Sequence, residues 1–211
     1  MEELLQFFGD HGLRILDILG AVVGLVYIYL EYRASIYLWL VGIIMPLIDM
    51  WLYFEAGLYA DFGMAIYYAL AALYGYAVWK WGFRLRSSER KEPPEISHIP
   101  GKQALYATFA FLIVWLALYE ILVHFTNSTV PVNDSFTSAL SIIALWVLSR
   151  KYVEQWLLWL VVDGISCGLY IYKGIPFKAG LYGLYVFIAI LGYFKWKRMM
   201  KATVGSKAQG A

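Results

Sequence analysis

Three residues on one predicted helix are suited to holding a flat ligand that carries an amine or a positive charge. Trp156, Trp159 and Asp163 lie in an apolar segment that runs from Val153 to Tyr172. At about 100° per residue, their side chains fall on the same face of a helix. Indole rings attract cations, and a carboxylate accepts hydrogen bonds from an amine. The pattern therefore predicts a ligand site on this face.

Asp163 also lies deep within the predicted helix. At about 1.5 Å per residue it is roughly 15 Å from Val153, near the middle of a bilayer. An ionisable group at that depth is costly and marks a functional site by default. A structural explanation is also open, in which neighbouring hydroxyls satisfy Asp163 and the two tryptophans anchor the helix at the membrane surface. We favour a ligand site, because a tryptophan near mid-helix is not at headgroup level.

Further polar and aromatic residues are candidates to complete the site. Cys167 and Tyr170 share the face of Asp163, and Asp49 lies inside the second apolar segment, three residues after Pro46. A proline inside a helix removes one backbone hydrogen bond and can kink the helix. For the tyrosines on the third and seventh predicted helices, the sequence alone favours packing or an interface role over ligand contact. The candidate substrate-binding residues are Trp156, Trp159, Asp163, Cys167, Tyr170, Asp49, Tyr67 and Tyr185.

The composition is that of a membrane protein. Of the 211 residues, 62% are apolar and only 15% are charged, whereas soluble domains have about a quarter charged residues. The longest polar stretch covers only residues 82–103, which leaves no room for a soluble domain. The N-terminus is acidic, so we expect no cleavable signal peptide. The single cysteine excludes an internal disulfide.

Apolar runs predict seven membrane-spanning helices, and hence an all-α membrane protein. The predicted helices cover residues 13–30, 35–54, 62–81, 105–125, 136–148, 154–172 and 179–196. The fifth is short for a bilayer, and we expect it to extend beyond Ser149.

Basic residues orient this predicted bundle. Fourteen of the 17 Lys and Arg residues fall on the side that holds the 82–104 loop and the C-terminal tail. Because cytoplasmic loops are enriched in Lys and Arg, this side is predicted to be cytoplasmic and the N-terminus to be outside. Topology alone accounts for the basic clusters, so they indicate no nucleic-acid partner.

The first three predicted helices resemble the last three. The segment around Trp39 aligns with that around Trp159 at an offset of 120, which pairs Asp163 with Ile43. Gly75 aligns with Gly192 at an offset of 117. We therefore predict two parallel three-helix repeats, residues 13–81 and 136–196. They are joined by a cytoplasmic loop over 82–104 and a linking helix over 105–125, and a cytoplasmic tail over 197–211 follows, its last residues disordered.

Parallel repeats of this kind are a transporter architecture, with the substrate site near the midplane between the halves. A non-transporting scaffold subunit remains the alternative, since duplicated bundles also occur in larger complexes. The sequence has no glycine-rich phosphate loop and no His or Cys pair at metal-ligand spacing. A membrane enzyme is therefore disfavoured, and we expect no metal and no cofactor.

The motif Trp156-x-x-Trp159-x-x-x-Asp163, preceded by residues 149–155, resembles the Pnu vitamin-transporter family. Residues 168–174, residues 57–61 and the stretch that ends at Trp79 are also similar to that family, so the resemblance covers nearly the whole chain. It implies a fold like that of the SWEET sugar transporters, with seven helices in a three-one-three arrangement.

The resemblance also implies a function. Pnu transporters carry vitamins across the bacterial inner membrane by facilitated diffusion, and a cytosolic kinase traps the vitamin by phosphorylation. The implied partners are a vitamin and membrane lipids, and a homo-oligomer is compatible with the family. Branches carry nicotinamide riboside or thiamine. The nicotinamide riboside branch has Asn at the last motif position, where this chain has Asp163.

That departure bears on the substrate. An ionised Asp163 only accepts hydrogen bonds, which suits the aminopyrimidine donor and the thiazolium charge of thiamine. Nicotinamide riboside is also cationic, so charge alone does not decide between the two. The hydrogen-bonding groups favour thiamine, with nicotinamide riboside as the alternative.

Overall fold

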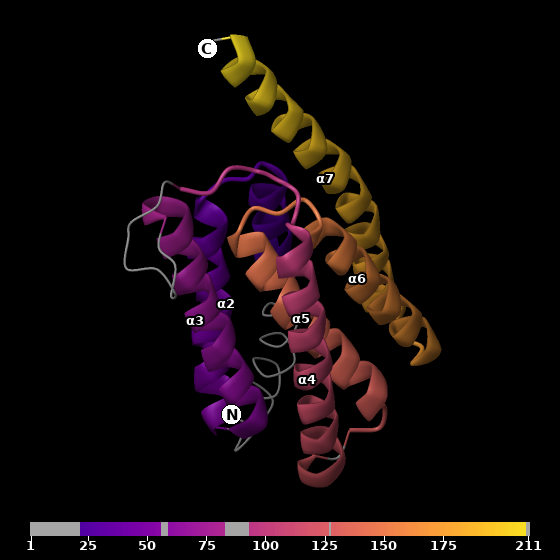
Figure 1. Ribbon diagram of the computed structural model, residues 1–211. Helices are drawn as coiled ribbons and strands as arrows, with labels where there is room; N and C mark the ends of the chain where they lie inside the picture. The colour runs from indigo at the N-terminus through magenta and orange to yellow at the C-terminus, as the bar shows by residue number, and fades with distance from the viewer. Residues whose placement is uncertain (1–21, 56–58, 83–92, 127, 210–211) are drawn as a thin grey trace, which may run out of the picture. The chain divides into compact units, whose positions relative to one another are not determined.

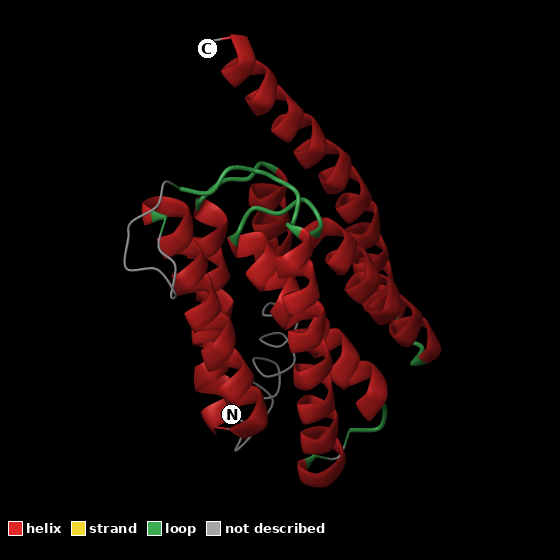
Figure 2. Cartoon of the chain, viewed as in Figure 1, coloured by secondary structure: helices red, strands yellow, loops and turns green. Residues whose placement is uncertain are grey.

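The computed structural model describes residues 22–55, 59–82, 93–126 and 128–209, and these residues form helices joined by short loops (Figure 2). The predicted all-α class is confirmed for this part of the chain, in which the one β-type pairing is an isolated bridge between Ser97 and Tyr152. After a first helix over Val22–Tyr32, the helices labelled in Figure 1 are α2 (Tyr37–Glu55), α3 (Tyr59–Trp81), α4 (Gly101–Phe125), α5 (Pro131–Ser149), α6 (Gln155–Tyr172) and α7 (Pro176–Gln209).

Several of these helices are suited to crossing a membrane. Five of the described segments are long and apolar enough: Phe62–Trp81, Gly101–Phe125, Pro131–Ser149, Gln155–Tyr172 and Pro176–Thr203. Val22–Tyr32 and Tyr37–Ile48 are apolar but shorter. A span of the hydrocarbon core needs about 20 apolar residues, and a helix satisfies all of its backbone groups internally. The chain is therefore a multi-pass helical membrane protein.

The chain divides into two compact units between Tyr76 and Ala77. The first unit contains the Val22–Tyr32 helix, α2 and most of α3. The second unit contains the end of α3 and all of α4 to α7. Within the second unit, α6 packs against both α5 and α7, and α4 packs against α5 (Figure 1). These contacts place the predicted ligand-binding face of α6 among its neighbours.

The same local backbone geometry occurs once in each unit. Ala34 and Lys151, 117 positions apart, both have positive φ, of 50° and 56°. Each donates its amide to a carbonyl three residues earlier, Glu31 or Leu148, at 2.8 Å. Three more backbone hydrogen bonds near Ala34 recur 117 positions later. The bonds near Ala34 run from Ser35 N to Leu30 O, Leu38 N to Ser35 O and Trp39 N to Ile36 O. The matching bonds near Lys151 run from Tyr152 N to Val147 O, Gln155 N to Tyr152 O and Trp156 N to Val153 O.

Packing after this turn repeats with the same spacing. A Cβ added at Gly75 would lie 2.4 Å from the Trp39 ring, and a Cβ added at Gly192 would lie 2.6 Å from the Trp156 ring. The offset of 117 therefore holds for the second helix of each half as well as the third. This local geometry favours a spacing of 117 over the aligned 120 in the second helix, and at 117 the residue that matches Asp163 is Pro46 instead of Ile43.

Several predicted boundaries also change. The fifth helix gains its length at the opposite end from the one expected, because α5 starts at Pro131 and ends at Ser149. Proline favours the first helical position, where a missing N–H costs nothing. α4 starts at Gly101 instead of 105. α7 continues through Gln209, so the prediction of a disordered tail is wrong up to that residue. Residues 13–21 of the first predicted helix lie outside the described residues.

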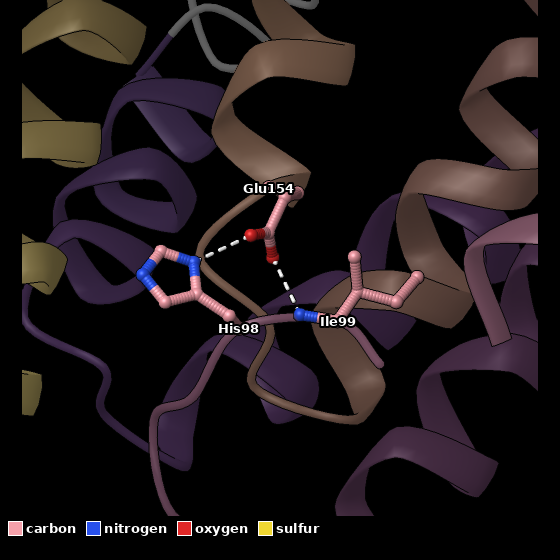
Figure 3. Close-up of polar contacts among 3 residues, drawn as sticks. All are labelled: His98, Ile99 and Glu154. Atoms are coloured by element: carbon pink, nitrogen blue, oxygen red, sulfur yellow. Dashed lines mark hydrogen bonds and ion pairs between the residues drawn. The ribbon is translucent and has the colours of Figure 1, made fainter. Parts of the chain in front are cut away.

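Residues 93–100, which we call the strap, lie along the connection between α5 and α6. The Ser97 amide donates to Lys151 O at 3.2 Å, and the Val153 amide donates to Ser97 O at 3.0 Å. Glu154 accepts from the Ile99 amide at 3.0 Å and pairs with the His98 ring at 2.6 Å (Figure 3). This part of the predicted 82–104 loop is therefore held in place.

Lys151 completes this junction. Its ammonium lies 4.3 Å from the centre of the Trp79 ring. Burial lowers the pKa of Lys151, and the nearby Glu95 opposes that shift. The Trp79 indole donates to Ser149 O at 3.2 Å. The end of α3, the strap and the start of α6 are thus joined by specific polar contacts.

Candidate functional site

The site predicted on α6 begins with two tryptophans that have different surroundings. Trp156 is 1% exposed. Its ring covers Gly192 of α7 and lies edge-on to Trp196, with ring centres 5.9 Å apart. Trp39 covers Gly75 in the same way. This shared contact indicates that Trp156 has a packing role. Its ring fixes α6 against α7.

Trp159 lies one turn further along α6 and is only half-buried. Its indole Nε1 is shielded from solvent and has no hydrogen-bond partner among the described residues. A buried indole N–H usually finds a partner. The residue equivalent to Trp159 in the first half is Gly42, so the repeat gives this ring no structural counterpart. Trp159 is therefore the tryptophan of the pair with the stronger case for a ligand contact.

Asp163 is 6% exposed and lies one turn beyond Trp159. It interacts electrostatically with Tyr185 of α7, so the structure brings these two predicted site residues together. Tyr185 lies edge-on to Tyr182 at 5.8 Å, and Tyr182 stacks on Tyr170 at 5.2 Å. A carboxylate and three phenol rings thus line the contact between α6 and α7.

Cys167 lies on the same face and faces α7. Its thiol donates to the Ala179 carbonyl at 3.3 Å and lies 3.8 Å from the position of a Cβ at Gly183. Lys178 lies 5.4 Å from the centre of the Tyr170 ring. Cys167 and Tyr170 therefore contact α7 directly, and the predicted grouping on one face of α6 is present in the second unit.

The remaining two predicted residues belong to the first unit. Asp49 lies within α2, and its side chain is outside the described part of the structure. Tyr67 lies on α3 with its ring centre 5.6 Å from that of Tyr68. At the 117 spacing the equivalent of Tyr185 is Tyr68, not Tyr67. Their roles in binding remain predictions.

One polar residue of this face was not a candidate from the sequence. Gln155 is the first residue of α6 and is fully buried, at 0% exposure. Neither its amide oxygen nor its amide nitrogen has a hydrogen-bond partner among the described residues. The sequence placed Gln155 at the membrane surface, where a glutamine is ordinary. At the spacing of 117, Gln155 corresponds to the apolar Leu38. This difference in polarity is what draws attention to Gln155.

The described residues contain no group of three or more His, Cys, Asp or Glu side chains that could hold a metal ion. The polar atoms of the α6 face are instead one carboxylate, one amide, a thiol, phenols and indole N–H groups. Such a set binds an organic molecule by hydrogen bonds and ring contacts. Apolar helices of spanning length define an integral membrane protein, and the predicted site on this face is suited to a small organic ligand.

Comparison with known proteins gives the family. The model of the family described as nicotinamide mononucleotide transporter matches residues 14–198, so the chain belongs to this family. The resemblance to Pnu transporters inferred from the tryptophan motif is thereby confirmed. The protein is a membrane transporter of this vitamin-transporter family and is not an enzyme.

Curated relatives cover most of the chain at low identity. The nicotinamide riboside transporter PnuC of Escherichia coli K12 is 26% identical, over 89% of this chain and 87% of its own length. The nicotinamide riboside transporter PnuC of Neisseria mucosa is 24% identical, over 88% and 73%. The riboflavin/roseoflavin transporter RibM of Streptomyces davaonensis is 26% identical, over 85% and 83%.

A solved structure supports the fold. The crystal structure of the vitamin B3 transporter PnuC has a TM-score of 0.66 with this chain at 22% identity, and the match covers 94% of this chain and 90% of the other.

Proposed function

We propose that this protein carries thiamine across a bacterial inner membrane by facilitated diffusion, and that phosphorylation in the cytosol traps the vitamin. The observation that carries this proposal is Asp163, a buried carboxylate one turn from the half-buried ring of Trp159. A buried carboxylate with no ion pair among the described residues favours a ligand that brings a positive charge or an amine. Thiamine brings both, on two flat rings.

Nicotinamide riboside is the second candidate. Three curated relatives with E. coli, Shigella flexneri and Neisseria origins are named for that substrate, and its pyridinium ring also carries a charge. A riboflavin transporter matches at the same 26% identity as the E. coli protein. Overall identity therefore does not select the vitamin, and the choice depends on the side chains of the α6 face.

The proposed architecture is two parallel three-helix repeats joined by α4, with the N-terminus outside and the C-terminus in the cytoplasm. The positive-φ turns at Ala34 and Lys151 and the two tryptophan–glycine contacts support the repeat. The distribution of basic residues supports the orientation. Repeats of this kind form a substrate site that opens alternately to each side.

A binding titration of the purified protein tests the substrate. Tryptophan fluorescence is followed while thiamine, nicotinamide riboside or riboflavin is added to the parent and to Asp163→Asn. Loss of one charge-assisted hydrogen bond costs about 1.5–3 kcal/mol, so thiamine binding should weaken roughly ten- to a hundred-fold. Glu120→Gln is the matched control, because that carboxylate is 66% exposed and pairs with His124 on its own helix.

The outcomes separate the candidates. A parent that binds thiamine, with a weakened Asp163→Asn and an unchanged Glu120→Gln, supports the proposal. A parent that binds nicotinamide riboside tightly and thiamine not at all rejects thiamine and leaves a vitamin transporter. If Asp163→Asn keeps the parent's affinities, Asp163 is a structural acid and does not contact the vitamin.

A further inference from the structure

Gln155 is a fully buried amide whose polar atoms have no hydrogen-bond partner in the described part of the chain. Its exposure is 0%, and neither Oε1 nor Nε2 has a partner among the described residues. A buried polar group without a partner costs about 1–3 kcal/mol. Because buried side-chain amides are nearly always hydrogen-bonded, this amide requires an explanation that the described residues do not supply.

The repeat shows that the fold does not need a glutamine here. The equivalent of Gln155 is Leu38, which is also 0% exposed and also precedes a tryptophan that covers a glycine. An apolar side chain thus fills this position in one half of the molecule. Replacing an unpaired buried amide with leucine removes a desolvation cost. The polar residue in the second half is unfavourable for packing and points to another role.

The difference between the halves extends along α6. Positions 155, 159 and 163 carry Gln, Trp and Asp, whereas their equivalents 38, 42 and 46 carry Leu, Gly and Pro. Residues four apart lie within about 40° of each other on a helix. Gln155, Trp159 and Asp163 therefore form one row on α6, with about 12 Å of helix axis between its ends. The first half has no such row.

We propose that Gln155 contacts the substrate and sets its specificity. The vitamin then lies along the row from Gln155 to Asp163. The inference rests on the proposed function. The amide offers an acceptor and a donor side by side, which matches an adjacent donor and acceptor on the edge of a heterocycle. The substrate class is a flat heterocycle with such an edge at the Gln155 end and a charged or amine-bearing part at the Asp163 end.

The test uses pairs of ligands that differ only at that edge. Each pair is compared between the parent and variants that lack the amide. Gln155→Leu copies the residue found at Leu38, and Gln155→Met is the second variant, because methionine adapts to irregular spaces. Each is titrated with thiamine and with oxythiamine, in which a carbonyl replaces the ring amine, and with nicotinamide riboside and nicotinic acid riboside. Unfolding temperatures without ligand report on stability.

We expect either variant to unfold at or above the parent's temperature and to bind the preferred vitamin about ten-fold more weakly. The ratio of affinities for that vitamin and its edge analogue should also fall toward one, which a purely structural residue would not cause. Unchanged affinity ratios in a variant that folds would overturn the inference while leaving the transporter proposal intact. If both variants unfold earlier and keep the parent's ratio, Gln155 is structural. A parent that binds none of the four ligands rejects the proposed function, and the role of Gln155 with it.

Discussion

At the residue scale, the two tryptophans of the α6 motif perform different tasks. Trp156 lies against Gly192 and Trp196, and Trp39 lies against Gly75 in the same way as Trp156 lies against Gly192. Trp159 has no counterpart of its kind in the first half and is half-buried. We therefore interpret Trp156 as a packing residue that positions α6, and Trp159 as the ring proposed to contact the substrate.

This division predicts different effects of two alanine variants. Trp156→Ala should destabilise the protein by about 3–5 kcal/mol, because it removes a large ring from a closed contact. Trp159→Ala should leave the unfolding temperature closer to that of the parent but weaken vitamin binding, since a ring contact contributes about 0.5–2 kcal/mol. Thermal unfolding and fluorescence titration of each variant measure the two effects. Equal losses of stability would contradict the division of roles.

At the element scale, α6 is fixed by its contact with α7. The ring of Trp156 lies so close to Gly192 that no Cβ fits between them. Gly164, on α6 itself, has nothing within 4 Å of an added Cβ. These two glycines therefore form a matched pair, one needed for close packing and one not.

Gly192→Ala should displace the Trp156 ring and destabilise the protein by about 1–3 kcal/mol. Because α6 then shifts against α7, vitamin binding should weaken as well. Gly164→Ala should be neutral or slightly stabilising, since alanine is the better helix former. Thermal unfolding of both variants measures this, and a Gly192→Ala protein as stable as Gly164→Ala would show that the close contact is absent.

The strap holds the same, N-terminal end of α6. Glu154 accepts a hydrogen bond from the Ile99 amide and pairs with His98 (Figure 3). Glu154→Ala should cost about 1 kcal/mol by leaving that amide without its partner. Glu120→Ala breaks a similar but exposed pair with His124 and should cost little. The difference in unfolding temperature between the two variants tests whether the strap stabilises the start of α6.

Long apolar segments predicted most of the helices. The spacing of Trp156, Trp159 and Asp163 predicted that these side chains share one face of α6. Other features have no local signal. Ala34 and Lys151 adopt positive φ although neither is glycine. The turn that sets the register between the two halves could therefore not be predicted from the sequence. The strap depends on bonds between residues about 55 positions apart. The last apolar run predicted a seventh helix that ends at residue 196, yet α7 continues through Gln209.

At the scale of the whole molecule, basic residues predict the orientation in the membrane. The C-terminal end of α7 should be cytoplasmic. In intact cells, a membrane-impermeant thiol reagent should label a cysteine placed at Asn133 and not one placed at Ser206, in a Cys167→Ser background. Labelling at Ser206 with protection at Asn133 would show that the orientation is inverted.

We expect this protein to transport a vitamin passively. Uptake of the vitamin into liposomes measures that transport. Purified protein in liposomes, without an ion gradient or a nucleotide, should let labelled thiamine enter until the inner and outer concentrations are equal. Trp159→Ala should slow that entry. If thiamine, nicotinamide riboside and riboflavin all enter no faster than into protein-free liposomes, the proposed function is contradicted.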